Sequence, residues 1–137
     1  MSPAFGDAPF VDSSVVVRYL VGQPVDMAER ARKIIDDEPA LTLSELAILE
    51  SAFVLNKTYG IDRQSTVRAL SDLVQRRNIH TLQVTKAYLL EALDLCRPSG
   101  RVSFGDALLW AEAVSAGTGR IFTFDRRFPD RGITLAD

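Results

Sequence analysis

The sequence predicts an α/β layer fold with a mainly parallel sheet. Short β-prone segments alternate along the chain with longer segments in which apolar residues recur at helical spacing, and this alternation is typical of strand–helix–strand units. The 137 residues are about the size of one domain. The sequence contains no internal repeat, low-complexity tract or glycine–serine linker. We therefore predict a single domain over residues 1–137, with residues 1–8 as a loose N-terminal leader.

Four helices and two short strands are predicted in the first half of the chain. Residues 9–12 are apolar and β-prone, and we predict that they form a buried strand ending at Asp12. Ser44 and Asp62 favour helix N-termini, because their side-chain oxygens accept hydrogen bonds from free backbone N–H groups of the first turn. The predicted order is a strand at 9–12, helices at 14–21 and 25–37, a strand at 41–43, and helices at 44–58 and 62–74.

Three further strands and two helices are predicted in the second half. Residues 79–84 and 121–124 are apolar and β-prone, and the second of these runs ends at Asp125. Ser103 is expected to cap a helix that ends before a pair of glycines. The predicted order is a strand at 79–84, helices at 85–96 and 103–114, a strand at 121–124 and an edge strand at 132–135.

The composition excludes several classes of function. The chain has 16 Lys and Arg against 18 Asp and Glu, a formal net charge of −2, so a basic protein body that captures nucleic acid is excluded and only a local basic groove remains open. The single cysteine, Cys96, excludes a disulfide within the chain and a Cys-x-x-Cys zinc site. The single histidine, His80, excludes metal clusters built on several histidines.

The sequence carries no signal for export or membrane insertion. No segment approaches 18 consecutive apolar residues, and the first ten residues lack the basic and apolar regions of a signal peptide. A lone thiol also fits a reducing compartment. We therefore expect a cytoplasmic protein without a membrane span.

Four carboxylates occupy positions that favour a shared site. Asp12 and Asp125 follow predicted strands, and function in parallel sheets is concentrated where strands end. Glu50 lies within an apolar run, and Asp106 lies in the first turn of a predicted helix. Because converging carboxylates repel one another, the usual remedy is a hard divalent cation with oxygen ligands, Mg²⁺ or Mn²⁺.

Each carboxylate also has a structural interpretation when it is taken alone. Asp12 fits a helix N-cap, Asp106 fits the acidic first turn of a helix, and Asp125 fits a turn. A solvated helix edge is the corresponding interpretation for Glu50. Glu45 is an alternative to Glu50, because five helical residues place the two about 140° apart around the axis and both cannot face one metal ion. The apolar residues that flank Glu50 favour Glu50.

Four segments surround these carboxylates, in order along the chain. They are FVDSSVVVRYL at 10–20, LAILESAFVL at 46–55, VSFGDALL at 102–109 and IFTFDRRF at 121–128. Together they resemble the PIN-domain ribonucleases and, within that family, the VapC toxins of bacterial toxin–antitoxin operons. The resemblance covers nearly the whole chain.

The resemblance implies both a fold and an activity. The fold would be a three-layer α/β/α sandwich with a central sheet of short, mainly parallel strands. The activity would be that of an endoribonuclease that needs Mg²⁺ or Mn²⁺ and hydrolyses RNA phosphodiester bonds at a site made of Asp12, Glu50, Asp106 and Asp125. Asp12 and Asp106 would be the principal metal ligands. The ion would lower the pKa of a bound water and offset charge on the phosphate, and one or two ions could serve.

Small hydroxyl side chains accompany the carboxylates. Ser13, Ser14 and Thr123 match positions beside the family's site, and we expect them to hydrogen-bond around the metal ligands. The family often has Asn where this chain has Ser14, which leaves the role of Ser14 open.

The resemblance also implies partners. Arg18, Arg126 and Arg127 are candidates for contacts with RNA phosphates, which would position the RNA without reading its sequence. A solvated or acid-paired surface position is the alternative for each arginine. A VapB-like antitoxin that wraps the toxin and a homodimer are further implications of the resemblance.

Other classes of protein fit the sequence less well. A non-catalytic PIN-like module that binds RNA or protein is the alternative function, and a missing carboxylate would favour it, but all four are present. A receiver domain would carry an early acidic pair and a late lysine, whereas Val11 precedes Asp12 and no lysine follows Lys86. A haloacid-dehalogenase-type phosphatase would carry Asp at the position of Ser14.

Overall fold

Six α-helices, one π-helical turn and four short strands follow one another in residues 7–136, the part of the chain that this computed structural model describes. Residues 1–6 and 137 lie outside this part, and with them most of the predicted leader; Ala8 is buried, and its carbonyl accepts a hydrogen bond from Thr42 Oγ1 at 2.9 Å. The elements are α1 (Ser13–Val21), α2 (Val25–Asp37), β1 (Leu41–Leu43), α3 (Glu45–Phe53), the π-helical turn η2 (Val54–Thr58), α4 (Arg63–Val74), β2 (Ile79–Thr81), α5 (Lys86–Leu95), α6 (Phe104–Ser115), β3 (Arg120–Phe122) and β4 (Thr134–Ala136).

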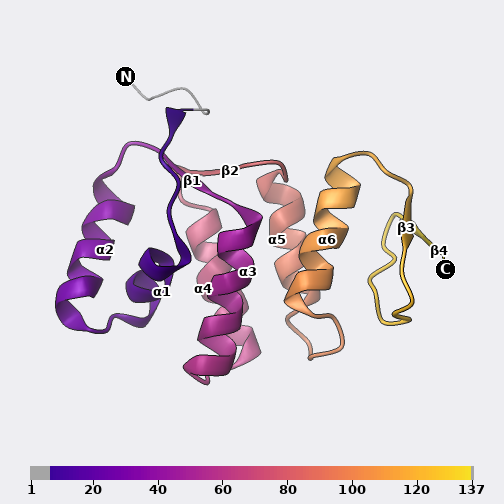
Figure 1. The fold of residues 1–137 in the computed structure, drawn as a ribbon, viewed down its shortest axis with the longest axis horizontal. Helices are drawn as coiled ribbons and strands as arrows, with labels where there is room; N and C mark the ends of the chain where they lie inside the picture. Colours follow the sequence, from indigo (N-terminus) through magenta and orange to yellow (C-terminus); the bar gives the residue numbers. More distant parts are fainter. Residues whose placement is uncertain (1–6, 137) are drawn as a thin grey trace.

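The elements are arranged along one long axis, nearly in sequence order (Figure 1). Helices α1 and α2 form one end of the molecule, and β3 and β4 form the other. Helices α3 and α4 stand next to the first end, and α5 and α6 stand between them and the β3–β4 pair. Helix α1 packs on α2 and α3, while α5 packs on α4 and α6. This order matters for function, because it keeps the last strands away from the first ones.

The strands are short and parallel, and they belong to two sheets. Strand β1 pairs with β2, with Leu41 opposite Ile79, and β3 pairs with β4, with Arg120 opposite Thr134. The predicted α/β class with short parallel strands is confirmed. Within the described residues, however, no ladder joins the two pairs into the single central sheet that the sequence led us to expect.

The predicted strand at 9–12 is reduced to a single bridge between Phe10 and Thr42. The Val11 N–H donates to the Thr42 carbonyl at 3.0 Å, and the Thr42 N–H donates to the Pro9 carbonyl at 2.7 Å. In the described part of the chain this segment pairs on that side only, because β3 lies beyond α5 and α6 (Figure 1). Val11 is buried as predicted, but Phe10 is 64% exposed, so the prediction of a fully buried strand was wrong.

The other strand boundaries differ from the predicted ones by a few residues. Strand β2 ends at Thr81 instead of residue 84, because the Val84 N–H donates to the Glu45 carboxylate rather than to a neighbouring strand. Strands β3 and β4 cover 120–122 and 134–136, where the sequence predicted 121–124 and 132–135. The chain has therefore left its strand geometry before it reaches Asp125.

A helix is present at each predicted position, but the one predicted at 44–58 is divided into α3 and the π-helical turn η2. The predicted caps Ser44, Asp62 and Ser103 are in place. Ser44 Oγ accepts a hydrogen bond from the Ala47 N–H at 3.2 Å, and Ser103 Oγ accepts one from the Asp106 N–H at 3.0 Å. Asp62 caps α4 in the same way. Such a cap contributes about 1 kcal/mol to stability. None of the helices in residues 7–136 has both the length and the apolar character that crossing a membrane requires.

The apolar core lies between the helices. Trp110 and Leu70 are among its largest members and are at most 1% exposed, and Cys96 is packed in the same core. Each large apolar side chain that leaves water contributes about 1.5–3 kcal/mol. Trp110 Nε1 also donates to the Arg131 carbonyl at 2.7 Å, which ties the segment between β3 and β4 to helix α6.

Candidate functional site

Asp12 is the N-cap of α1 and an exposed, ionised carboxylate. Its Oδ2 accepts a hydrogen bond from the Ser14 N–H at 3.0 Å. Hydrogen bonds from the Ser14 side chain and backbone, with a smaller contribution from the Ser13 backbone, hold the pKa of Asp12 below its ordinary value. The carboxylate is thus charged at neutral pH, as a ligand for a hard cation must be.

Asp12 and Glu50 line the same cavity. The cavity has a volume of about 220 Å³ and lies where the chain before α1 passes over the start of α3. Its remaining lining is mostly apolar, so the two carboxylates are its charged groups. The complete lining is Phe10, Val11, Asp12, Ser44, Leu46, Ala47 and Glu50.

Glu45 and Glu50 have opposite surroundings on α3. Glu45 is 9% exposed, and its Oε1 accepts a hydrogen bond from the Val84 N–H at 2.9 Å. Glu50 is exposed and faces the cavity that it shares with Asp12. Glu45 is therefore engaged in holding the turn after β2, and Glu50 is the member of the pair that is available to a ligand.

Asp106 lies in the first turn of α6, a helix that packs on α3. Its backbone N–H is held by Ser103 Oγ, and the side chain is partly exposed. A Cβ atom on Gly105 would lie 4.0 Å from Leu49 Cδ1, so the first turn of α6 contacts α3 one residue before Glu50. The helices that carry Asp106 and Glu50 are thus direct neighbours.

Asp125 lies apart from the other three carboxylates. Its Oδ1 accepts a hydrogen bond from the Arg127 N–H at 2.8 Å, and its own N–H donates to Thr123 Oγ1 at 3.0 Å. The Arg127 Nε lies 3.5 Å from Asp125 Oδ1. Asp125 and Arg126 line a separate cavity at the β3–β4 end of the molecule, beyond α5 and α6 (Figure 1).

The structure therefore brings together part of the predicted site. Asp12 and Glu50 share a cavity, Asp106 lies on the adjacent helix, and Asp125 is remote. Among residues 7–136, no three His, Cys, Asp or Glu side chains come close enough together to hold a metal ion as a group. The separation of β3 from residues 9–12 accounts for the remote position of Asp125, because Asp12 ends the one segment and Asp125 follows the other.

The donor atoms at the Asp12–Glu50 cavity suit a hard divalent cation. Carboxylate oxygens are the ligands that Mg²⁺ prefers, and Mg²⁺ commonly takes only one or two of them and keeps several waters. The lining contains no thiol or imidazole, which would favour a softer metal. The residues present thus fit Mg²⁺ or Mn²⁺, and Asp12 and Glu50 are the two carboxylates that line the cavity.

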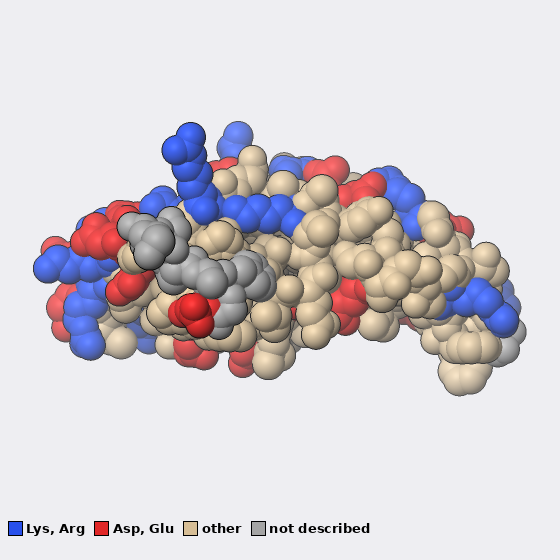
Figure 2. Space-filling model, turned by 90° about the horizontal axis from the view of Figure 1, so that it is seen from above, with Lys and Arg blue, Asp and Glu red and all other residues tan. Residues whose placement is uncertain are grey.

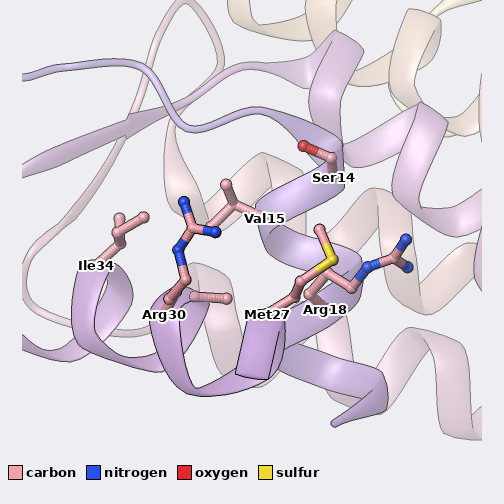
Figure 3. A pocket seen from close by; sticks show the side chains of 7 residues that line it. Ser14, Val15, Arg18, Met27, Arg30 and Ile34 are labelled. Carbon is pink, nitrogen blue, oxygen red and sulfur yellow. The ribbon is translucent and has the colours of Figure 1, made fainter. Parts of the chain in front are cut away.

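Arg18 lies on α1, the helix that Asp12 caps, and borders a second cavity. Its Nη1 donates to Tyr59 Oη at 3.0 Å, while its Nε is buried without a hydrogen-bond partner. The cavity has a volume of about 210 Å³ and lies between α1 and α2. Figure 3 shows Arg18 and Arg30 extending on either side of Met27. The lining residues are Ser14, Val15, Arg18, Met27, Arg30, Ala31 and Ile34.

On the face seen in Figure 2, charged side chains of both signs are present. Figure 2 shows basic and acidic residues intermingled on the upper face, most densely at the end formed by α2. This mixture agrees with the formal net charge of −2.

Two contacts of this region were not predicted from the sequence. Tyr59 holds the Arg18 guanidinium, and Arg30 contributes the second cation of the α1–α2 cavity. Both positions depend on how helices far apart in the sequence pack on each other. An arginine three residues after Met27 on an amphipathic helix is the one sequence signal that could have indicated Arg30, and it is common to many solvated helices.

Short parallel strands between helices define an α/β domain, and the carboxylates Asp12 and Glu50 line one of its cavities. The model of the PIN domain family matches residues 10–133, which is nearly the whole chain. The chain belongs to the PIN domain family. PIN domains are generally nucleases that use divalent metal ions. No curated protein matches this chain.

Proposed function

We propose that this protein is an endoribonuclease that needs Mg²⁺ or Mn²⁺ and hydrolyses RNA phosphodiester bonds with Asp12, Glu50, Asp106 and Asp125. The observation that carries the proposal is the cavity shared by Asp12 and Glu50, in a chain of the PIN domain family. Hydrogen bonds from Ser14 lower the pKa of Asp12 there, and Glu50 is free of the backbone bond that engages Glu45.

Each carboxylate has a role in this proposal. Asp12 and Asp106 hold the metal ion, and Glu50 and Asp125 complete the site directly or through water. A divalent ion bound there would supply a water of lowered pKa and would offset charge on the phosphate. Ser13 and Ser14 keep Asp12 oriented through their hydrogen bonds.

Asp125 requires a movement to join the other carboxylates, and Thr123 would move with it. We infer that β3 pairs with the segment at 9–12 when the site assembles. Both have an open edge, and unpaired edges are templates for further pairing. Their aromatic side chains are exposed: Phe10 to 64%, Phe122 to 73% and Phe124 to 94%. Pairing of the two edges would bury these rings and bring Asp125 to the strand end at which Asp12 lies.

The RNA backbone is proposed to contact Arg18, Arg126 and Arg127. Arg18 lies on the helix that Asp12 caps, and Arg126 is exposed beside Asp125. Arg127 pairs with the exposed Asp125, and an exposed pair of this kind is weak enough to open for a phosphate. These contacts would position the strand without selecting its sequence.

The biological role is proposed to be that of a VapC-like toxin, acting in the cytoplasm as a homodimer and held inactive by a VapB-like antitoxin. The cavity between α1 and α2 supports this role. It is lined by Val15, Met27 and Ile34 and flanked by Arg18 and Arg30, for which the described residues provide no ion pair. An antitoxin segment that presents an apolar side chain next to acidic ones would fit it, and would lie close to Asp12 through Ser14.

The first experiment is cleavage of total RNA by the purified protein with Mg²⁺ or Mn²⁺. Asp12→Asn and Asp106→Asn should abolish the discrete fragments, EDTA should do the same, and Asp72→Asn, an exposed carboxylate on α4, should leave them unchanged. Fragments that survive both site substitutions would overturn the assignment. Growth arrest on expression in bacteria, absent in Asp12→Asn, would support the toxin role.

A non-catalytic PIN-like module is the second candidate. The observation that favours it is the absence, within residues 7–136, of three converging carboxylates. Binding of RNA by the folded protein without cleavage, in the presence of bound Mn²⁺, would replace the nuclease with this module.

A further inference from the structure

Arg63, the first residue of α4, joins this helix to the loop that precedes Asp106. Its Nη1 donates to the Cys96 carbonyl at 3.2 Å and to the Val102 carbonyl at 3.1 Å. These carbonyls stand at the two ends of the loop 97–101, which connects α5 to α6. A single guanidinium therefore closes this loop against the start of α4.

The same guanidinium fixes the first residue of α6. Its central carbon lies 4.7 Å from the centroid of the Phe104 ring, in cation–π geometry, and Phe104 is 8% exposed. Ser103, between Val102 and Phe104, caps the Asp106 N–H. Arg63 thus holds the residues on both sides of the cap that orients Asp106.

The chemistry of these contacts requires arginine in particular. Arg63 is partly buried, and within the described residues no ion pair links it to a carboxylate. Its charge instead strengthens the bonds to two carbonyls, and its flat face covers an aromatic ring at the same time. A lysine ammonium can donate to the carbonyls but has no planar face for Phe104.

We propose that Arg63 is a positioning residue for the metal ligand Asp106. It sets the direction of the first turn of α6, and with it the direction in which the Asp106 carboxylate leaves the helix. This inference rests on the proposed function, in which Asp106 binds the metal ion. Groups that orient a metal ligand commonly affect metal affinity about 10–100-fold when they are removed.

The test measures Mn²⁺ binding to the full chain by titration, together with thermal unfolding. Arg63→Gln should weaken Mn²⁺ binding about 10-fold at temperatures where the variant remains folded. Arg63→Lys should restore the affinity only in part. Arg68→Gln, at an exposed position on the same helix, should bind Mn²⁺ like the unmodified protein. In an Asp106→Asn background, Arg63→Gln should have no further effect, because the ligand that it orients has been removed.

Any of three results would overturn this inference but not the proposed function. Arg63→Gln could lower thermal stability without changing Mn²⁺ affinity, or Arg63→Lys could restore the Mn²⁺ affinity in full. The third is that Arg63→Gln weakens Mn²⁺ binding equally in the Asp106→Asn background. A protein that binds no Mn²⁺ in its unmodified form would overturn the proposed function, and the inference with it. The two failures are thus distinguished by the unmodified protein.

Discussion

The Ser14 backbone N–H donates a 3.0 Å hydrogen bond to Asp12 Oδ2, across the first turn of α1. Through this bond the Asp12 carboxylate has two roles. It satisfies a free N–H of the helix terminus, and it stabilises the charged form of Asp12 at the cavity shared with Glu50.

Ser14→Ala should raise the pKa of Asp12 toward its ordinary value of 3.8, measured by NMR titration of the side-chain carboxyl. The hydroxyl contribution disappears, while the backbone bond remains. Ser65→Ala is the matched control, because Ser65 lowers the pKa of Asp62 in the same way, and that substitution should move Asp62 and leave Asp12 unchanged. An Asp12 pKa that does not respond to Ser14→Ala would contradict this account.

The stability of the protein should fall at acidic pH through these two caps. The folded pKa values of Asp12 and Asp62 lie below the ordinary value of 3.8. Their contribution is therefore fully present above that pH and is lost as the pH falls through the folded values. Denaturant midpoints measured down the acidic range should decline less steeply in a protein that carries both Ser14→Ala and Ser65→Ala.

Glu45→Ala should lower the stability of the protein, whereas Glu50→Ala should lower its affinity for Mn²⁺. Glu45→Ala leaves the Val84 N–H without its partner and should cost about 1–3 kcal/mol of stability. Glu50→Ala removes an exposed side chain and should change stability by less than about 0.5 kcal/mol, yet weaken Mn²⁺ binding. Chemical denaturation and metal titration of both variants check the pair. If Glu45→Ala instead weakened Mn²⁺ binding in a fully stable protein, the choice between the two residues would be reversed.

Trp110→Phe should destabilise the protein by about 1 kcal/mol through the loss of the bond to the Arg131 carbonyl, over and above the smaller ring. Hydrogen exchange should rise most in the residues from β3 to β4, since this bond ties them to α6. Circular dichroism follows the unfolding, because the substitution removes the chain's one tryptophan. Uniformly faster exchange, with no preference for the C-terminal residues, would show that the bond does not anchor them.

Cys96 should resist alkylation in the folded protein. Burial raises the pKa of the Cys96 thiol to about 11 from an ordinary value of 9.0, so the reactive thiolate is scarce at mildly alkaline pH. The stabilisation linked to this group is complete below pH 9.0 and is lost as the pH rises toward 11. Iodoacetamide should label Cys96 only after denaturation, and rapid labelling of the native protein would contradict the packed thiol.

Spin labels on cysteines at positions 10 and 124 would report the approach of β3 to the segment before α1. Both phenylalanines are exposed, and the buried Cys96 should remain unlabelled. Addition of Mg²⁺ with RNA should produce a population of shorter label-to-label distances, because Asp125 must reach the other carboxylates. An unchanged distance distribution during active cleavage would remove Asp125 from the site.

The helices were predictable from the sequence, because the signals that start and stop them are local. Ser44 and Ser103 each cap an N–H group only three residues further along the chain, so the start of the helix can be predicted from adjacent residues. Strand pairing is not local in this sense. The pattern of residues 9–12 indicates a strand, but whether a second strand covers Phe10 depends on the position of a segment more than a hundred residues later.

In the candidate site, too, features that depend on adjacent residues were predictable and features that depend on distant residues were not. The position of Asp12 beside a helix start, and its bond from Ser14, follow from adjacent residues. The apolar flanks of Glu50 favoured it over Glu45 in the sequence, whereas the structure distinguishes the two residues by their burial. Glu45 is the buried one, because the turn at Val84 reaches back to it. That contact spans 39 residues and leaves no trace in the local pattern.

The hydrogen bond from Arg18 to Tyr59 connects α1 to the residue that follows η2, six residues beyond Asp12 and nine beyond Glu50. The two chain segments that carry these carboxylates are therefore fastened at both ends, by the pairing of Val11 with Thr42 at one and by this bond at the other. We therefore expect the cavity between Asp12 and Glu50 to resist widening. The spacing of the oxygens would then discriminate by ionic radius, accepting Mg²⁺ and Mn²⁺ and penalising the larger Ca²⁺, which requires more ligands at longer distances.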